Sequence, residues 1–304
     1  MRRSLVILFL LLLSLNSCKF SGSNSKGYKE LEEGIIKIFD NKDGMADFNA
    51  AAKKGNLEVY GLVTYYYGYS ALDFLEKHFK KSDGKAEYYY ASILISANSD
   101  EDRAIKLFEE AVKQGEYNAY YSLGTLYEDD LDYSTAMNYY EKGREKGDMF
   151  SLYAYEYLKA NKNSINKIES FGKKYKNGHI TPDEKKEMGK LILEKFSNYD
   201  KAYEILKEFV VDNYPPALYA KAKILQNEDK EGEAFAIFNE LYIRDKYYLG
   251  TFEMAFHEVN NQNFEKALSY LEDGSYNESL IYAYKGYIYR QLKLFKKSEE
   301  NYKK

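Results

Sequence analysis

The chain has 304 residues, of which 45% are hydrophobic and 30% are charged, and its formal net charge at pH 7 is −4. Lysine and glutamate are interspersed, and a mildly acidic chain of this kind is a poor candidate for nucleic-acid binding. A single cysteine excludes an internal disulfide framework, so the fold must be stabilised by apolar burial.

The first residues predict an export signal. Arg2 and Arg3 precede an unbroken apolar run from Leu5 to Leu13. This run is too short to cross the roughly 30 Å hydrocarbon core of a bilayer as a stable helix. We therefore predict a signal peptide at residues 1–17.

Residues 15–18, Leu-Asn-Ser-Cys, resemble the lipobox of bacterial lipoproteins, although Asn16 occupies a position that usually holds Ala, Ser, Thr or Val. The resemblance implies that the thiol of Cys18 carries diacylglycerol and that two or three acyl chains anchor the protein to a membrane. Residues 18–27 then comprise the lipidated cysteine and a flexible tether. Lys19 is not the Asp that favours inner-membrane retention in enteric bacteria, which implies the outer membrane in a cell with two membranes.

The sequence from residue 28 onward predicts an all-α fold, with an N-terminal helix within residues 28–46 and helical hairpins over residues 47–304. Proline is nearly absent, and Ala, Leu, Glu, Lys and Tyr recur at helical spacing. Small residues recur at intervals of 31 to 33, with one double interval, at Ser92, Gly124, Gly189, Ala222, Ala255 and Gly286. A second series follows 12 or 13 residues later, at Ala104, Ala136, Ala202, Ala234, Ala267 and Ser298. Two helices approach closely where such residues face the partner helix, so each pair of positions predicts one hairpin.

The clearest unit contains Tyr120, Leu123, Gly124, Tyr127, Ala136 and Tyr140. It resembles the tetratricopeptide (TPR) pattern W-x₂-L-G-x₂-Y…A-x₃-F, with tyrosine in place of Trp and Phe. Residues 111–124 are similar to the related Sel-like repeats. The resemblance implies a right-handed superhelical solenoid of about eight TPR/Sel-like helical hairpins. Residues 161–182 interrupt the pattern, and Thr181 and Pro182 predict the N-cap and first residue of a new helix.

In TPR proteins, the first helix of each hairpin lines a concave groove through the residues three before and one after the small residue. The resemblance therefore implies groove positions at Tyr89, Tyr121, Tyr153, Lys186, Lys190, Tyr219, Lys223, Phe252, Phe256 and Tyr287, and also at Ile93, Thr125, Tyr157 and Ala283. Tyr153 and Tyr157 follow when Glu156 is aligned with the small residues, and Ala154 is the alternative for that position. An aromatic stripe with a lysine patch suits an extended or helical peptide. The alternative is that these tyrosines only replace Phe and Trp in the hairpin cores, and the sequence leaves both interpretations open.

The sequence predicts no catalytic, cofactor or metal site. His78, His179 and His257 are far apart and have no cysteine partner, and no phosphate-binding loop motif occurs. The leading hypothesis is a lipid-anchored cell-envelope adaptor or scaffold that binds a protein or peptide partner through the groove. The alternative is a peptidoglycan-associated or envelope-assembly factor, such as a regulator of cell-wall synthases or a component of outer-membrane or pilus assembly. We expect no enzymatic activity.

Overall fold

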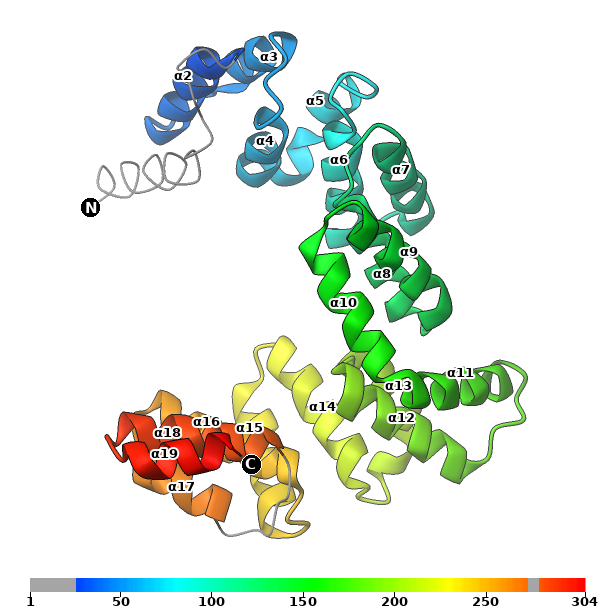
Figure 1. Ribbon diagram of the computed structural model, residues 1–304, viewed down its shortest axis with the longest axis vertical. Helices are drawn as coiled ribbons and strands as arrows, with labels where there is room; N and C mark the ends of the chain where they lie inside the picture. The colour runs from blue at the N-terminus through cyan, green and yellow to red at the C-terminus, as the bar shows by residue number, and fades with distance from the viewer. Residues whose placement is uncertain (1–25, 273–278, 304) are drawn as a thin grey trace. The chain divides into compact units, whose positions relative to one another are not determined.

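The computed structural model describes residues 26–272 and 279–303 (Figure 1). The predicted signal peptide, Cys18 and most of the tether lie outside this part of the chain. The described residues form helices, turns and bends without any strand, which confirms the all-α prediction. None of their helices is both long enough and apolar enough to cross a membrane.

The chain divides into two compact units, of which unit 1 ends at Tyr157 and unit 2 begins at Leu158. This boundary lies within α10 (Met149–Ala160), shortly before the interruption predicted at residues 161–182. In both units each helix packs mainly against helices that are near it in sequence. This pattern of packing is compatible with a solenoid.

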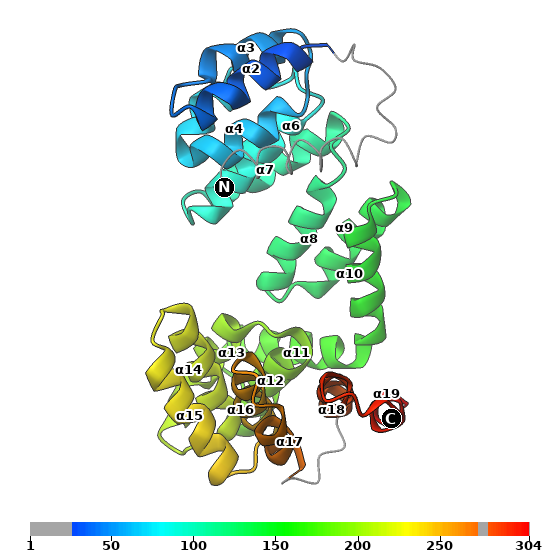
Figure 2. The same ribbon diagram turned by 90° about the vertical axis from the view of Figure 1, so that its left-hand side faces the viewer.

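The first helix of unit 1 within the described residues is α2 (Tyr28–Phe39), which packs on α3 (Met45–Lys53) as Figure 2 shows. The chain continues through α4 (Val59–Tyr67), the 3-10 helix η1 (Gly68–Ala71) and α5 (Leu72–Glu76). Two longer pairs follow: α6 (Lys85–Ser96) with α7 (Glu101–Lys113), and α8 (Ala119–Asp129) with α9 (Tyr133–Glu145).

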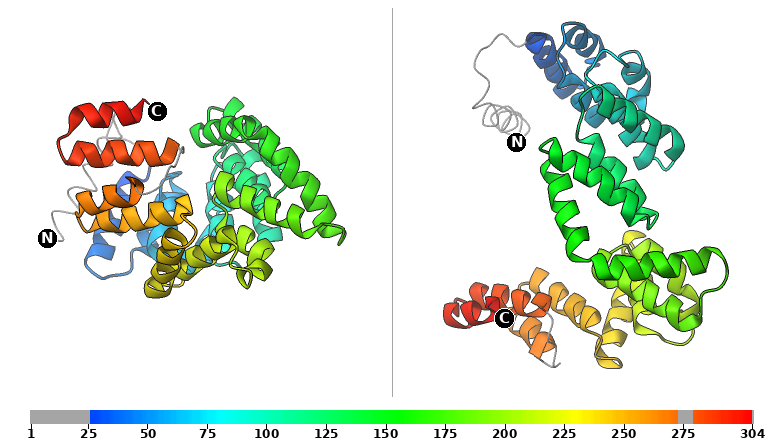
Figure 3. Two further views of the ribbon diagram at one scale, coloured as in Figure 1. Left: turned by 90° about the horizontal axis from the view of Figure 1, so that it is seen from below. Right: turned by 45° about the vertical axis from the view of Figure 1, so that its right-hand side comes forward.

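Unit 2 contains α11 (Lys162–Lys176), α12 (Pro182–Phe196), α13 (Tyr199–Leu206) and η2 (Lys207–Val210). It continues with α14 (Pro215–Asn227), α15 (Glu231–Ile243), α16 (Tyr248–Asn260), α17 (Phe264–Glu272), α18 (Ser279–Gln291) and α19 (Phe295–Tyr302). The pairs α12/α13, α14/α15, α16/α17 and α18/α19 lie side by side, and Figure 3 shows the last pair in red.

The predicted start of α12 is confirmed. The Thr181 hydroxyl accepts a hydrogen bond from the backbone N–H of Glu184, and the Glu184 carboxylate accepts one from the backbone N–H of Thr181. Pro182 occupies the first turn, where its missing N–H leaves no helical hydrogen bond unmade.

The small residues lie where the two helices of a pair meet. Gly124, Gly189 and Gly286 belong to the first series, and a methyl group added to any of them would overlap a side chain of the following helix. These overlapping side chains are Tyr140, Leu206 and Tyr302. Each stands four residues after the small residue of the second series, even in the one unit with an offset of 13. The spacing in the sequence therefore reflects close helix packing.

The turn that joins the two helices of a pair also has a repeated conformation. In each of these turns a residue other than glycine adopts a positive φ. The set is Asn98, Leu131, Ser197, Asp229, Gln262 and Lys293. After most of them the next backbone N–H bonds to a carbonyl five residues earlier, as from Asp132 to Tyr127 and from Lys230 to Leu225. This is the Schellman motif of helix C-termini.

The turn between α2 and α3 has the same geometry. Asn41 has a φ of 57°, and the N–H of Lys42 donates to the carbonyl of Lys37 at 2.8 Å. Gly34 of α2 lies against the ring of Phe48 in α3, as the glycines of the later pairs lie against their partners. Residues 28–46 therefore contain the first helix of a hairpin and the start of its second, instead of one separate helix before the array.

Candidate functional site

Helix α8 carries three polar residues along one face. Tyr121, Thr125 and Glu128 are separated by four and three residues, which aligns their side chains in an α-helix. Leu123 and Gly124 lie on another face and are buried against neighbouring helices. Packing through Leu123 and Gly124 therefore fixes the direction in which the first three side chains point.

These three residues line a cavity of about 250 Å³ in unit 1. The other lining residues are Asp129 of α8, Tyr140 of α9, and Tyr153, Ala154 and Tyr157 of α10. The cavity is open to solvent, because Tyr153 is 75% exposed. We call this set of residues the α8–α10 pocket.

Aromatic rings form the walls of the α8–α10 pocket. The centroid of the Tyr121 ring lies 5.8 Å from that of Tyr140 and 5.6 Å from that of Phe150. Tyr153 and Tyr157 stand one turn apart on α10 and stack with their centroids at 6.4 Å. Such rings present electron-rich faces, which attract cations as well as apolar groups.

Glu128 supplies the negative charge of the pocket. Its carboxylate is half-buried and accepts a hydrogen bond of 2.8 Å from the Tyr140 hydroxyl. Burial raises the pKa of Glu128 above its ordinary value, the Tyr140 hydrogen bond lowers it, and the charge of Asp129 raises it further. Within the described residues no lysine, arginine or histidine forms an ion pair with Glu128.

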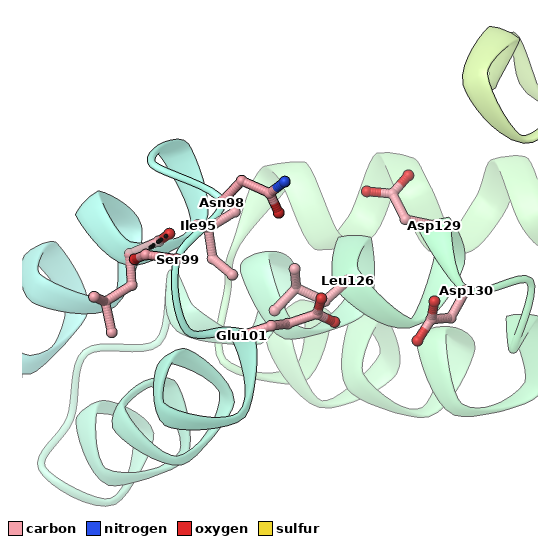
Figure 4. Close-up of a pocket in the computed structure, with 8 residues that line it drawn as sticks. Ile95, Asn98, Ser99, Glu101, Leu126, Asp129 and Asp130 are labelled. Carbon is pink, nitrogen blue, oxygen red and sulfur yellow. Dashed lines mark hydrogen bonds between the residues drawn. The ribbon is translucent and has the colours of Figure 1, made fainter.

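A second cavity, of about 380 Å³, lies between α6, the start of α7 and the end of α8 (Figure 4). Glu101, Asp129 and Asp130 contribute carboxylates to it, but Figure 4 shows that those of Asp129 and Asp130 point in different directions. No group of three or more His, Cys, Asp or Glu side chains in the described residues could hold a metal ion. This cavity therefore has no convergent set of ligands.

Helix α14 of unit 2 repeats the spacing of α8 with different contacts. Tyr219 stands three residues before the small residue Ala222 and Lys223 stands one after it, as Tyr121 and Thr125 flank Gly124 in α8. The Nζ of Lys223 donates to Oε1 of Glu253 in α16 at 3.1 Å, and the Tyr219 hydroxyl donates to the same oxygen at 2.8 Å.

The ammonium group of Lys223 also faces two rings. Its Nζ lies 5.3 Å from the ring centroid of Tyr199 and 6.0 Å from that of Phe238. The side chains of Lys223 and Glu253 are only 19% and 10% exposed. We call Tyr199, Tyr219, Lys223, Phe238 and Glu253 the α14–α16 cluster, which is a closed ion pair surrounded by aromatic rings.

The structure brings Tyr121, Thr125, Tyr153 and Tyr157 together, as their groove positions imply. The prediction that Tyr219 lines an accessible surface is wrong, because Tyr219 is only 3% exposed and packs against Phe238 in the next helix. The lysine patch is also divided, because Lys223 is paired with Glu253 inside the protein.

The remaining predicted groove residues lie in several environments. Phe252 and Phe256 stack along α16 and contact Tyr284 of α18, beside which the partly exposed Tyr287 lies. The half-buried Tyr89 places its hydroxyl against Gly61 of α4. Lys186 lies 4.8 Å above the ring of Phe209, whereas Lys190 is exposed.

Sequence reasoning does not identify Glu128. The chain contains 48 acidic residues, and Glu128 is distinguished by its place beside the aromatic rings of α8, α9 and α10 in the α8–α10 pocket. The one available signal is its spacing of seven residues from Tyr121 and three from Thr125, which places it on the predicted groove face.

No protein-family model matches the chain, and no curated protein matches it. The interpretation of the α8–α10 pocket therefore depends on its own geometry and chemistry.

Proposed function

We propose that this chain is a lipid-anchored adaptor of the bacterial cell envelope that binds a protein or peptide partner through the α8–α10 pocket and the surface around it. The proposed architecture is a right-handed TPR-type solenoid of about eight hairpins. The observation that carries the proposal is the solvent-open aromatic pocket formed by Tyr121, Tyr140, Tyr153 and Tyr157.

Exposed apolar side chains extend the pocket along the first turns of α10. Phe150 is 68% exposed although it touches Tyr121, and Met149 beside it is also exposed. Large side chains that stay in contact with water next to an aromatic cavity are typical anchor points of protein interfaces. Binding a partner would cover this apolar area, which favours a protein or peptide over a small polar ligand.

The anchoring part of the proposal depends on Cys18. Since no other thiol exists in the chain, Cys18→Ser is expected to leave it without lipid. Phase partitioning in a cloud-point detergent measures this directly, with wild-type protein as the reference. A Cys18→Ser protein that still enters the detergent phase like wild type would contradict lipid anchoring.

Site-specific photo-crosslinking tests the binding part. A benzophenone amino acid replaces Tyr153 in one variant and Tyr65, which is 78% exposed on α4, in the control variant. After irradiation of intact cells, we expect a discrete, protease-sensitive adduct from position 153 and not from position 65. Identical adducts at both positions, or none at 153, would contradict this site. An adduct at 153 that only a cell-wall hydrolase removes would support the peptidoglycan-associated alternative.

A further inference from the structure

Two hairpins of the chain place similar aromatic side chains at the same repeat positions. Tyr121 and Tyr219 stand three residues before the first small residue, and Tyr140 and Phe238 stand sixteen after it. The Tyr121 and Tyr140 ring centroids are 5.8 Å apart, and those of Tyr219 and Phe238 are 5.5 Å apart. The two sites can therefore be compared at these positions.

In unit 2 this arrangement holds the ammonium group of a lysine. Lys223 extends from the position after the small residue to the Glu253 carboxylate, past the rings of Tyr199 and Phe238. A carboxylate stabilises the ammonium charge, and aromatic faces contact both that charge and the methylene stem. The protein itself thus shows which chemical group this combination of side chains accommodates.

In unit 1 the residue at the position of Lys223 is Thr125. The Thr125 hydroxyl donates to the carbonyl of Ser122 in its own helix at 2.8 Å, and its short side chain cannot reach across the pocket. A carboxylate is nevertheless present, because Glu128 extends from the next turn of α8. The α8–α10 pocket therefore contains the equivalent ring pair and a carboxylate from a different position, Glu128 of α8 in place of Glu253 of α16. A cavity of about 250 Å³ lies beside Thr125, where no lysine side chain of the described residues extends.

We propose that the α8–α10 pocket binds the side-chain ammonium of a lysine from the partner protein, between the Glu128 carboxylate and the rings of Tyr121, Tyr153 and Tyr157. This inference rests on the proposed adaptor function and specifies the chemistry of the partner. The uncompensated charge of Glu128 is complementary to a cation, and Asp129 at the rim adds to the negative potential. Phe150 and Met149 lie where apolar residues flanking the lysine can pack.

Saturation-transfer NMR with the purified full chain in deuterated detergent tests the pocket. The probe is N-acetyl-lysine methylamide, and the matched control is N-acetyl-norleucine methylamide, which has a similar stem without the ammonium. We expect transfer to the lysine methylenes and at least about tenfold weaker binding of norleucine, since 1.4 kcal/mol corresponds to a factor of ten. Equal binding of both probes would overturn the proposal.

Two variants assign the binding to Glu128. Glu128→Gln removes the charge but keeps a hydrogen-bond acceptor for Tyr140, and it is expected to abolish the preference for lysine over norleucine. The control is Glu145→Gln, an equal charge change at an exposed position of α9, which is expected to leave the preference unchanged. Loss of the preference in both variants, or in neither, would contradict the site.

Thr125→Lys provides an internal competitor. It recreates the lysine position of unit 2, so its ammonium is expected to occupy the pocket and to exclude the probe. Asn138→Lys, which adds the same charge at an exposed position of α9 outside the pocket, is expected to bind the probe like wild type. Circular dichroism of both variants checks that they are folded. A folded Thr125→Lys protein that binds the probe as wild type does would show that lysine does not occupy this pocket.

The two proposals can fail separately. Lysine-selective binding without a protein adduct at position 153 would support the cation pocket and contradict the adaptor function. A protein adduct at position 153 without lysine selectivity would support the adaptor and contradict the cation pocket. Acetylcholine serves as a third probe, and tighter binding of it than of the lysine probe would contradict a lysine side chain in favour of a quaternary ammonium group.

Discussion

The α8–α10 pocket and the α14–α16 cluster use the same repeat positions to opposite effect. In the α14–α16 cluster, Lys223 neutralises Glu253 and fills the space between the rings. In the α8–α10 pocket, Thr125 leaves Glu128 partly desolvated without a cation from the described residues. The residue after the small position is thus one difference between a closed, structural site and an open one, and the helix that supplies the carboxylate is another, α16 for Glu253 and α8 for Glu128. Open sites of this kind lower stability in return for accessible chemistry.

The largest difference in stability between the two sites is expected when Lys223 or Thr125, the residue after the small position, is replaced by Met. Lys223→Met leaves the Glu253 carboxylate buried with the hydrogen bond from the Tyr219 hydroxyl but without its cation, and breaking a buried ion pair costs about 3–5 kcal/mol. Thr125→Met adds apolar contacts to an open pocket and should leave stability nearly unchanged. Urea unfolding followed by circular dichroism measures both, and equal losses would contradict the distinction between a closed and an open site.

A smaller effect is expected at the small residues themselves. A methyl group on Gly124 would overlap the Tyr140 ring and displace its hydroxyl from Glu128, so Gly124→Ala should destabilise by about 1–3 kcal/mol through overpacking. In unit 2 the equivalent Ala222 already accommodates its methyl group, and Ala222→Gly should cost about 1 kcal/mol, mainly in helix propensity. Thermal unfolding compares the two. If Gly124→Ala stabilised the protein, the frame that aligns the hairpins would be incorrect.

The smallest effect concerns the pH dependence of stability. Because burial raises the pKa of Glu128 in the folded state, the folded protein binds this proton more tightly than the unfolded chain does. The Glu128 contribution therefore becomes less favourable as pH rises through that pKa. Glu128→Gln should raise the melting temperature at pH 7 relative to wild type, and the gain should shrink as the pH falls toward 4. A gain that is independent of pH would show that the charge is not its cause.

The sequence predicts the repeat frame and much of the pocket wall, because both follow from short-range periodicity. Tyr121 and Thr125 are placed by their distance from Gly124, and Tyr153 and Tyr157 by the alignment of α10 with the other first helices. The hairpin formed by α2 and α3 is not predicted, although Gly34 and Ala46 are separated by the 12 residues that mark the later units.

Burial at the two sites depends on contacts between hairpins, which the sequence does not specify. Tyr121 and Tyr219 have the same repeat position, yet Tyr219 is closed in by Tyr199 and Tyr247 on either side. The sequence around Glu128 likewise does not distinguish it from other acidic residues, and its partial burial is due to its contacts with α9 and α10. Local spacing therefore identifies which residues share a face, and the neighbouring helices decide which of them remain accessible.

The hydroxyl groups of the tyrosines have a consequence for how the repeats find their correct neighbours. A chain of similar hairpins risks pairing with the wrong repeat during folding, since any apolar ring can fill any equivalent socket. A tyrosine in place of phenylalanine adds a hydroxyl that needs a hydrogen-bond acceptor once it is buried. For Tyr289, Tyr219 and Tyr247 the acceptor is a glutamate of another hairpin, 17, 34 and 53 residues away. Each acceptor is a particular glutamate, so a hairpin docked one repeat out of place would bury its hydroxyl unbonded, at about 1–3 kcal/mol. The tyrosines can thus favour the correct pairing of hairpins. Burial of their rings stabilises contacts between hairpins in general, and the hydrogen bonds of their hydroxyls form only with the correct neighbour.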